Sequence, residues 1–131
     1  MTALGIIILY LSFRLKHVSC DFLLNNAWMA LNRGKKGLDG YVPLAAHAAI
    51  HGGGTLVICL LFFPALWWLA IVDFFVHGLI DRIKAVLTLR KSWGETDKAY
   101  WVSLGIDQEA HNLTHLCYII LIIMSAGGII L

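Results

Sequence analysis

Four long apolar segments follow one another along the chain and are separated by short polar or proline-containing stretches. Each segment is long enough to supply the roughly 20 helical residues that cross the hydrocarbon core of a bilayer. Pro64 leaves only a short turn between the second and third segments, so these two should form an antiparallel hairpin. The pattern predicts an all-α polytopic membrane protein, an antiparallel bundle of four transmembrane helices at about residues 4–31, 42–63, 66–89 and 99–125.

The composition of the chain supports a membrane protein. Of its 131 residues, 60% are hydrophobic and 14% are charged, whereas charged residues make up roughly 25% of a typical soluble domain. Four spans with short connections use nearly the whole chain, so we expect residues 1–131 to form a single four-span transmembrane domain. The formal net charge of +2 is too small and too localised to predict a nucleic-acid partner.

The basic residues predict the orientation of the bundle. They gather after the first span and around the connection between the third and fourth, whereas the turn at Pro64 and both ends of the chain contain none. By the positive-inside rule, the two basic loops face the cytoplasm and both termini face the outer side. Tryptophans near the predicted span ends fit an aromatic belt: Trp28, Trp67, Trp68, Trp93 and Trp101. The basic residues that follow the first span are Arg33, Lys35 and Lys36; those that surround the connection after the third span are Arg82, Lys84, Arg90, Lys91 and Lys98.

Histidine and aspartate recur inside the apolar segments at a spacing of four residues. Residues four apart lie above one another on one face of an α-helix, so each segment presents a narrow polar stripe. The stripes come late in the first and third segments and early in the second and fourth, which places all four at a similar depth in the cytoplasmic half. They are His17 with Asp21, His47 with His51, Asp73 with His77 and Asp81, and Asp107 with His111 and His115.

The chemistry of these stripes predicts a metal site. An ionisable group inside a membrane costs about 2.5–3.5 kcal/mol or more and usually faces a partner, a cavity or an ion. Mixed imidazole and carboxylate ligands suit one or two divalent transition metal ions such as zinc, manganese or iron; the expected ligands are His17, Asp21, His47, His77, Asp81, Asp107 and His111. Supporting contacts to the ligands are expected from His51, Asp73 and His115. The competing interpretation is that the stripes only form hydrogen bonds between helices.

Two basic residues share the predicted polar layer. Arg14 lies on the same helical face as His17 and Asp21, and Lys84 follows Asp81 by three residues. Both side chains could contact a phosphate or another anionic head group at the site. The alternative, favoured for Lys84, is that the ammonium group extends to the membrane surface or neutralises a nearby charge.

Three consecutive glycines at residues 52–54 interrupt the second segment. Glycine destabilises a helix interior, so a run of three needs a structural reason. In membrane helices, small residues let a neighbouring helix approach closely. We therefore expect these glycines to mark either a close helix contact or a local break in the helix.

The polar residues together resemble the pattern of the bacterial and phage membrane family catalogued as domain of unknown function 3307. The likeness covers about residues 13–120, and Asn25 stands where glutamine is expected. The resemblance implies a small polytopic protein of the bacterial inner (cytoplasmic) membrane with a shared polar motif, and it implies no particular reaction. It is carried by His17 and the run Asp21-Phe-Leu-Leu-Asn25, by His47, by His77 with Ile80, Asp81 and Lys84, and by Asp107 with Gln108 and His111.

Three classes of function remain open. The first is a metal-dependent hydrolase of a lipid or membrane-derived phosphoester, in which the ion activates water and a carboxylate takes its proton. The second is a non-catalytic accessory subunit of a larger membrane complex or a homo-oligomer, in which the His/Asp layer only staples the helices. The third is redox chemistry or transport; aspartates would line a haem poorly, so no haem is expected, and the aliphatic outer half disfavours an ion path. Membrane lipids are the expected partners in each case.

Overall fold

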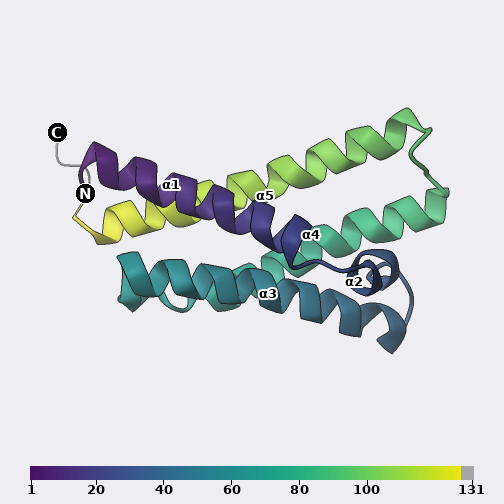
Figure 1. Ribbon diagram of the computed structural model, residues 1–131, viewed down its shortest axis with the longest axis horizontal. Helices are drawn as coiled ribbons and strands as arrows, with labels where there is room; N and C mark the ends of the chain where they lie inside the picture. Colours follow the sequence, from purple (N-terminus) through teal and green to yellow (C-terminus); the bar gives the residue numbers. More distant parts are fainter. Residues whose placement is uncertain (128–131) are drawn as a thin grey trace.

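The computed structural model describes residues 1–127, and all of its regular elements are helical over that range (Figure 1). Four long helices run back and forth through the molecule: α1 (Ala3–Val18), α3 (Leu38–Phe62), α4 (Leu69–Lys91) and α5 (Lys98–Ser125). Helix α1 packs on α3 and α5, and α4 packs on α3 and α5. The all-α prediction is confirmed; residues 128–131 of the expected domain lie outside the described residues.

The connecting loops that contain the basic residues lie at one end of the bundle. At one end lie the start of α1, the end of α5 and the 3-10 turn η2 (Pro64–Leu66), which joins α3 to α4 (Figure 1). At the other end lie the short helix α2 (Ala27–Asn32) and the connection between α4 and α5 (Figure 1). Both basic loops therefore share one end of the bundle.

The first expected span, residues 4–31, is divided in the structure. Helix α1 continues into a π-helical turn, η1 (Ser19–Leu23), and the chain then breaks before α2 begins. The side-chain oxygen of Asn26 accepts a hydrogen bond from the Met29 N–H at 3.0 Å and so caps α2. Asparagine is favoured at this position because its side chain satisfies an N–H group that the first turn leaves free. The other three long helices lie close to their expected ranges.

Two helical segments within residues 1–127 are long and apolar enough to cross a membrane: Ala3–Leu23 and Leu38–Phe62. Helices α4 and α5 have sufficient length, 23 and 28 residues, but their sequences are less apolar on average than those of α1 and α3.

The interior of the bundle has an apolar part and a polar part. The apolar core lies toward the chain termini and includes Leu9, Phe13, Leu69 and Ile122. The histidines and aspartates fill the remainder of the interior.

The glycine run lies where helices approach closely. A Cβ atom on Gly52 would lie 2.9 Å from the backbone oxygen of Ala70 in α4, and one on Gly54 would lie 2.8 Å from Cγ of Lys16 in α1. Gly53 has nothing within 4 Å at that position. The predicted close approach is therefore confirmed at two of the three glycines, and α3 remains helical through the run.

Candidate metal centre

The four polar stripes meet in the interior of the bundle. Asp21 reaches this interior from the π-helical turn, in which the Leu24 N–H donates to the carbonyl of Ser19 at 3.0 Å. Such a turn is wider than an ordinary α-helical turn and frequently occurs at functional sites. It ends α1 at the level where the histidines of α3, α4 and α5 converge.

Asp21 contacts imidazoles from two helices. Its Oδ1 atom lies 3.3 Å from Nε2 of His47 and 3.2 Å from Nε2 of His51, while Oδ2 lies 3.1 Å from Nε2 of His17. Asp21, His47, His51 and His77 each offer a ligand atom, and these four atoms all lie within 4.8 Å of one another. Three of the four side chains are buried, so the group is set inside the bundle.

Asp81 forms the centre of an adjoining group. Its Oδ2 atom lies 3.2 Å from Nε2 of His47 and 3.6 Å from Nε2 of His77, and its Oδ1 atom lies 3.9 Å from Nε2 of His111. His77, Asp81 and His111 also offer ligand atoms within 4.8 Å of one another. Because His77 belongs to both groups, the two form one assembly, which we call the His/Asp cluster: Asp21, His47, His51, His77, Asp81 and His111.

The His/Asp cluster fits a bound transition metal. Its buried imidazole Nε2 atoms make no hydrogen bond within residues 1–127, although a carboxylate oxygen lies 3.2–3.9 Å from each; they belong to His47, His51, His77 and His111. Ligand atoms about 2.0–2.1 Å from a tetrahedral ion are roughly 3.3–3.4 Å from one another. The 3.3 and 3.2 Å separations of Asp21 from His47 and His51 match that spacing. Imidazole nitrogens together with carboxylate oxygens are ligands that suit divalent transition metals.

Backbone and side-chain contacts orient the cluster. The Nδ1 atom of His111 lies 2.8 Å from the carbonyl oxygen of Asp107, which can only accept, so this nitrogen donates and Nε2 keeps its lone pair. Gln108 donates to Oδ2 of Asp21 at 3.3 Å, and its Oε1 atom lies 3.2 Å from Nε2 of His17. The carboxylate of Asp107 stands beside the cluster, with Oδ1 buried and without a hydrogen bond within residues 1–127.

A second polar group, the Lys16 cluster, lies next to the first and consists of Lys16, Thr55, Asp73 and His115. The Lys16 ammonium donates to Oδ2 of Asp73 at 2.7 Å and lies 3.2 Å from Nε2 of His115. The Thr55 hydroxyl donates to the same Asp73 oxygen, also at 2.7 Å. All four side chains are buried, and they join α1, α3, α4 and α5.

Cations approach the His/Asp cluster from the basic end of the bundle. Arg33 donates to Oδ2 of Asp81 at 2.6 Å, and the Arg33 carbonyl in turn accepts from Arg82 at 2.6 Å. A small pocket of about 130 Å³ opens beside them and brings carboxylates and cations to one wall; it is lined by Asp21, Phe22, Asn25, Arg33, Asp81, Lys84, Leu104, Asp107 and Gln108. Arg14 instead donates to the side chain of Asn112 and does not line this pocket.

The residues predicted from the sequence lie in the His/Asp cluster, at its edge, or in the Lys16 cluster. Five of the seven expected ligands belong to the His/Asp cluster, and His17 and Asp107 stand at its edge. His51, expected in a supporting position, lies inside the cluster, whereas Asp73 and His115 lie in the Lys16 cluster. Their roles as ligands or supporting groups remain predictions.

Lys16, Thr55 and Arg33 were not assigned to the polar interior of the bundle from the sequence. A buried role for Lys16 could have been inferred from the cost of a lysine in the middle of an apolar segment. Thr55 lies four residues after His51 on the same helix, so it continues the stripe of His47 and His51. Arg33 carried no such signal, because a loop arginine can point in many directions.

The chain was also compared with known proteins. No curated protein and no solved structure matches it. The profile of one family, described as "Protein of unknown function (DUF3307)", matches residues 7–129 and thus nearly the whole chain. The chain therefore belongs to the DUF3307 family, as its polar motif predicted.

Proposed function

We propose that all four long helices cross the bacterial inner membrane, with both termini outside and the basic loops in the cytoplasm. The support is an inverted distribution of polarity: every long helix has buried histidines and exposes large apolar side chains. Even α4 and α5 expose apolar residues on their outer faces, such as Phe75, Leu79, Leu113 and Met124, each more than half exposed. A soluble monomer rarely exposes apolar surface on this scale.

We further propose that the His/Asp cluster binds one or two divalent transition metal ions, with zinc, manganese and iron as the candidates. The observation that carries this proposal is the convergence of buried imidazole nitrogens on two carboxylates, Asp21 and Asp81; within the described part of the chain these nitrogens make no hydrogen bond. Burying these groups in a membrane is costly unless a partner satisfies them. An ion between them would supply that partner.

The chemistry we propose is hydrolysis of a lipid or membrane-derived phosphoester. A bound ion would supply a hydroxide nucleophile at neutral pH and polarise a phosphoryl oxygen. Asp107 stands at the edge of the cluster and on the wall of the small pocket, where it can take the proton of the attacking water. The water oxygen would form a bond to phosphorus, the bond from phosphorus to the ester oxygen would break, and the departing alkoxide would take up the proton that Asp107 removed from the water.

Access distinguishes this proposal from a purely structural site. A structural metal site is closed by its protein ligands, whereas a catalytic site keeps a position for water or substrate. Asp21 and Asp81 line the pocket of about 130 Å³, so the two carboxylates of the cluster are accessible from it. Arg33 and Lys84 on that wall would attract the negative charge of a phosphate.

Purified protein loaded with zinc, manganese or iron should release phosphate or alcohol from long-chain phosphomonoesters or phosphodiesters in phosphatidylcholine vesicles. Asp107→Asn should keep the bound metal and lower the rate by about 10²–10⁴-fold, the usual contribution of a general base. Glu109→Gln is the matched control because Glu109 is an exposed carboxylate on the same helix. Full metal occupancy without turnover of any phosphoester would contradict catalysis and favour an accessory subunit.

A further inference from the structure

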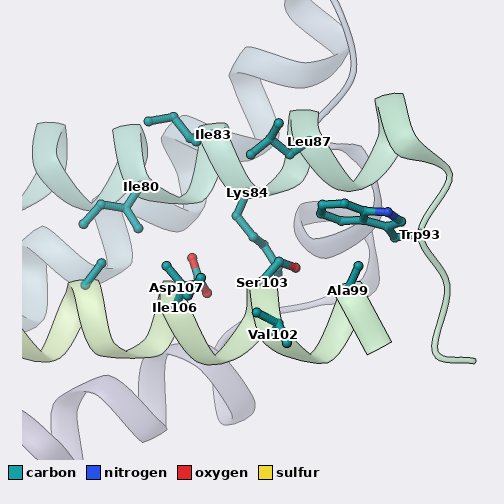
Figure 2. Close-up of a pocket in the computed structure, with 11 residues that line it drawn as sticks. Ile80, Ile83, Lys84, Leu87, Trp93, Ala99, Val102, Ser103, Ile106 and Asp107 are labelled. Atoms are coloured by element: carbon teal, nitrogen blue, oxygen red, sulfur yellow. The ribbon is translucent and has the colours of Figure 1, made fainter. Parts of the chain in front are cut away.

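A larger apolar pocket lies between α4 and α5, outside the His/Asp cluster. Its volume is about 410 Å³, within the range of roughly 300–1,000 Å³ that is common for small-molecule sites. Aliphatic side chains from both helices form most of its wall, and Trp93 closes the end near the loop (Figure 2). The Lys84 side chain extends from α4 across this space toward Ser103 on α5 (Figure 2).

The mouth of this pocket lies on the apolar exterior of the bundle. Three of its lining residues, Ile83, Val102 and Ile106, are 53%, 50% and 66% exposed. In a membrane, these side chains would contact lipid chains. An apolar molecule could therefore enter between α4 and α5 directly from the bilayer.

The apolar pocket and the small polar pocket share two residues. Lys84 and Asp107 line both, and the small pocket continues from them to Asp81 and Arg33. Arg33 is paired with Asp81, whereas the Lys84 ammonium has no hydrogen bond or ion pair within residues 1–127. The junction of the two pockets thus has a lysine ammonium without a hydrogen bond within residues 1–127, near the Asp107 carboxylate. An apolar chamber lies on one side of this junction and the candidate metal centre on the other.

From this geometry we infer that the α4–α5 pocket binds the hydrocarbon chain of a phosphorylated membrane amphiphile and that Lys84 binds its phosphate. The apolar wall would hold the chain, and the lysine would act as a point charge for the phosphate at the edge of the His/Asp cluster. The inference rests on the proposed function, because it identifies the substrate class of the same site. It assigns Lys84 to substrate binding rather than to the membrane surface.

Photo-crosslinking in phosphatidylcholine nanodiscs tests this assignment. The probe is a long-chain alkyl phosphate with a diazirine on its chain, and the labelled peptides are mapped by mass spectrometry. Labelling should concentrate at the pocket-lining positions of α4 and α5. Dodecyl phosphate should compete with the probe, whereas dodecanol and glycerol phosphate at equal concentration should not.

Two variants separate the phosphate contact from the chain contact. Lys84→Gln should lower labelling about tenfold, the effect of losing one charge-assisted hydrogen bond, while Lys91→Gln, on the same helix but outside the pocket, should leave it unchanged. Ala110→Leu should lower labelling by filling the chamber while Lys84 is intact. Equal competition by dodecanol or by glycerol phosphate, or labelling spread evenly over the outer faces of all helices, would overturn the inference.

Metal analysis of the same samples distinguishes the two proposals. Pocket labelling in a protein that holds no metal would support the amphiphile site and defeat the metal-dependent hydrolase. Metal in the wild type without labelling of the pocket would defeat the amphiphile site and leave the metal centre standing. The variant His77→Ala/Asp81→Ala should lose metal and still be labelled, because neither residue lines the α4–α5 pocket.

Discussion

The two buried polar clusters of this bundle are neighbours, yet their charges are satisfied in different ways. In the Lys16 cluster, a lysine ammonium lies 2.7 Å from Asp73, and Thr55 donates to the same carboxylate. In the His/Asp cluster, two carboxylates face imidazole nitrogens that make no hydrogen bond to any residue the structure describes, and Arg33 pairs with one of these carboxylates, Asp81. In the Lys16 cluster, the protein itself supplies the cation that neutralises the buried carboxylate. In the His/Asp cluster, the ligand atoms are free to bind an added cation.

This difference separates a candidate metal site from buried charges that the protein itself pairs. Both clusters are buried, and both would be costly to place in a membrane. Of the two, the His/Asp cluster is the one that groups possible metal ligands and has carboxylates lining a pocket. If burial of charge were the only criterion, both clusters would be equally good candidates for a metal site.

The largest stability effect should come from breaking the Lys16 cluster. Lys16→Met leaves the Asp73 carboxylate buried without its cation, which typically costs about 3–5 kcal/mol. The double variant Lys16→Met/Asp73→Asn should recover most of the loss, because it removes both charges. Unfolding of the purified variants in detergent measures both effects. A double variant as unstable as the single one would show that the ion pair is not the stabilising feature.

Removal of a bound metal should lower the stability of the protein through the His/Asp cluster and leave the Lys16 cluster intact. An ion present at about 100 times its Kd stabilises the folded state by roughly 2.7 kcal/mol, so a chelator should lower the unfolding temperature of the wild type. Lys16→Met/Asp73→Asn should show the same chelator-dependent decrease, because its altered residues do not contact the ion. A variant that no longer responds to the chelator would contradict the separation of the two clusters.

A smaller effect is expected at the glycine run between the clusters. Gly52→Ala would press a Cβ atom against the Ala70 carbonyl at 2.9 Å and force α3 away from α4, a change that typically costs about 1–3 kcal/mol. Gly53→Ala is the matched control, since nothing lies within 4 Å of its Cβ position, and it should stabilise the helix by about 0.5–1 kcal/mol. Equal stability of the two variants would refute the close contact.

The convergence of the stripes could be predicted from the sequence. Residues four apart share a helical face, and a polar face inside an apolar segment must turn away from lipid. The antiparallel order of the helices then brings Asp21, His47, His77 and His111 to one level. Periodicity and burial cost were sufficient for this part of the site.

Other features could not be predicted because they depend on contacts between distant segments. The pairing of Lys16 with Asp73 joins α1 to α4, and no local pattern specifies that distance. The break before α2 was hidden because apolar residues continue on both sides of the Asn26 cap. The position of Arg33 over Asp81 depends on how the loop folds back, which helical periodicity does not describe.

The most direct test of the metal centre is the metal content of the purified protein, measured by elemental analysis beside two double variants. The wild type and Lys16→Met/Asp73→Asn should both contain one or two equivalents of zinc, manganese or iron. His77→Ala/Asp81→Ala should contain almost none, because it removes ligands from both groups of the His/Asp cluster. Wild-type protein without metal, or equal metal in all three proteins, would contradict the account.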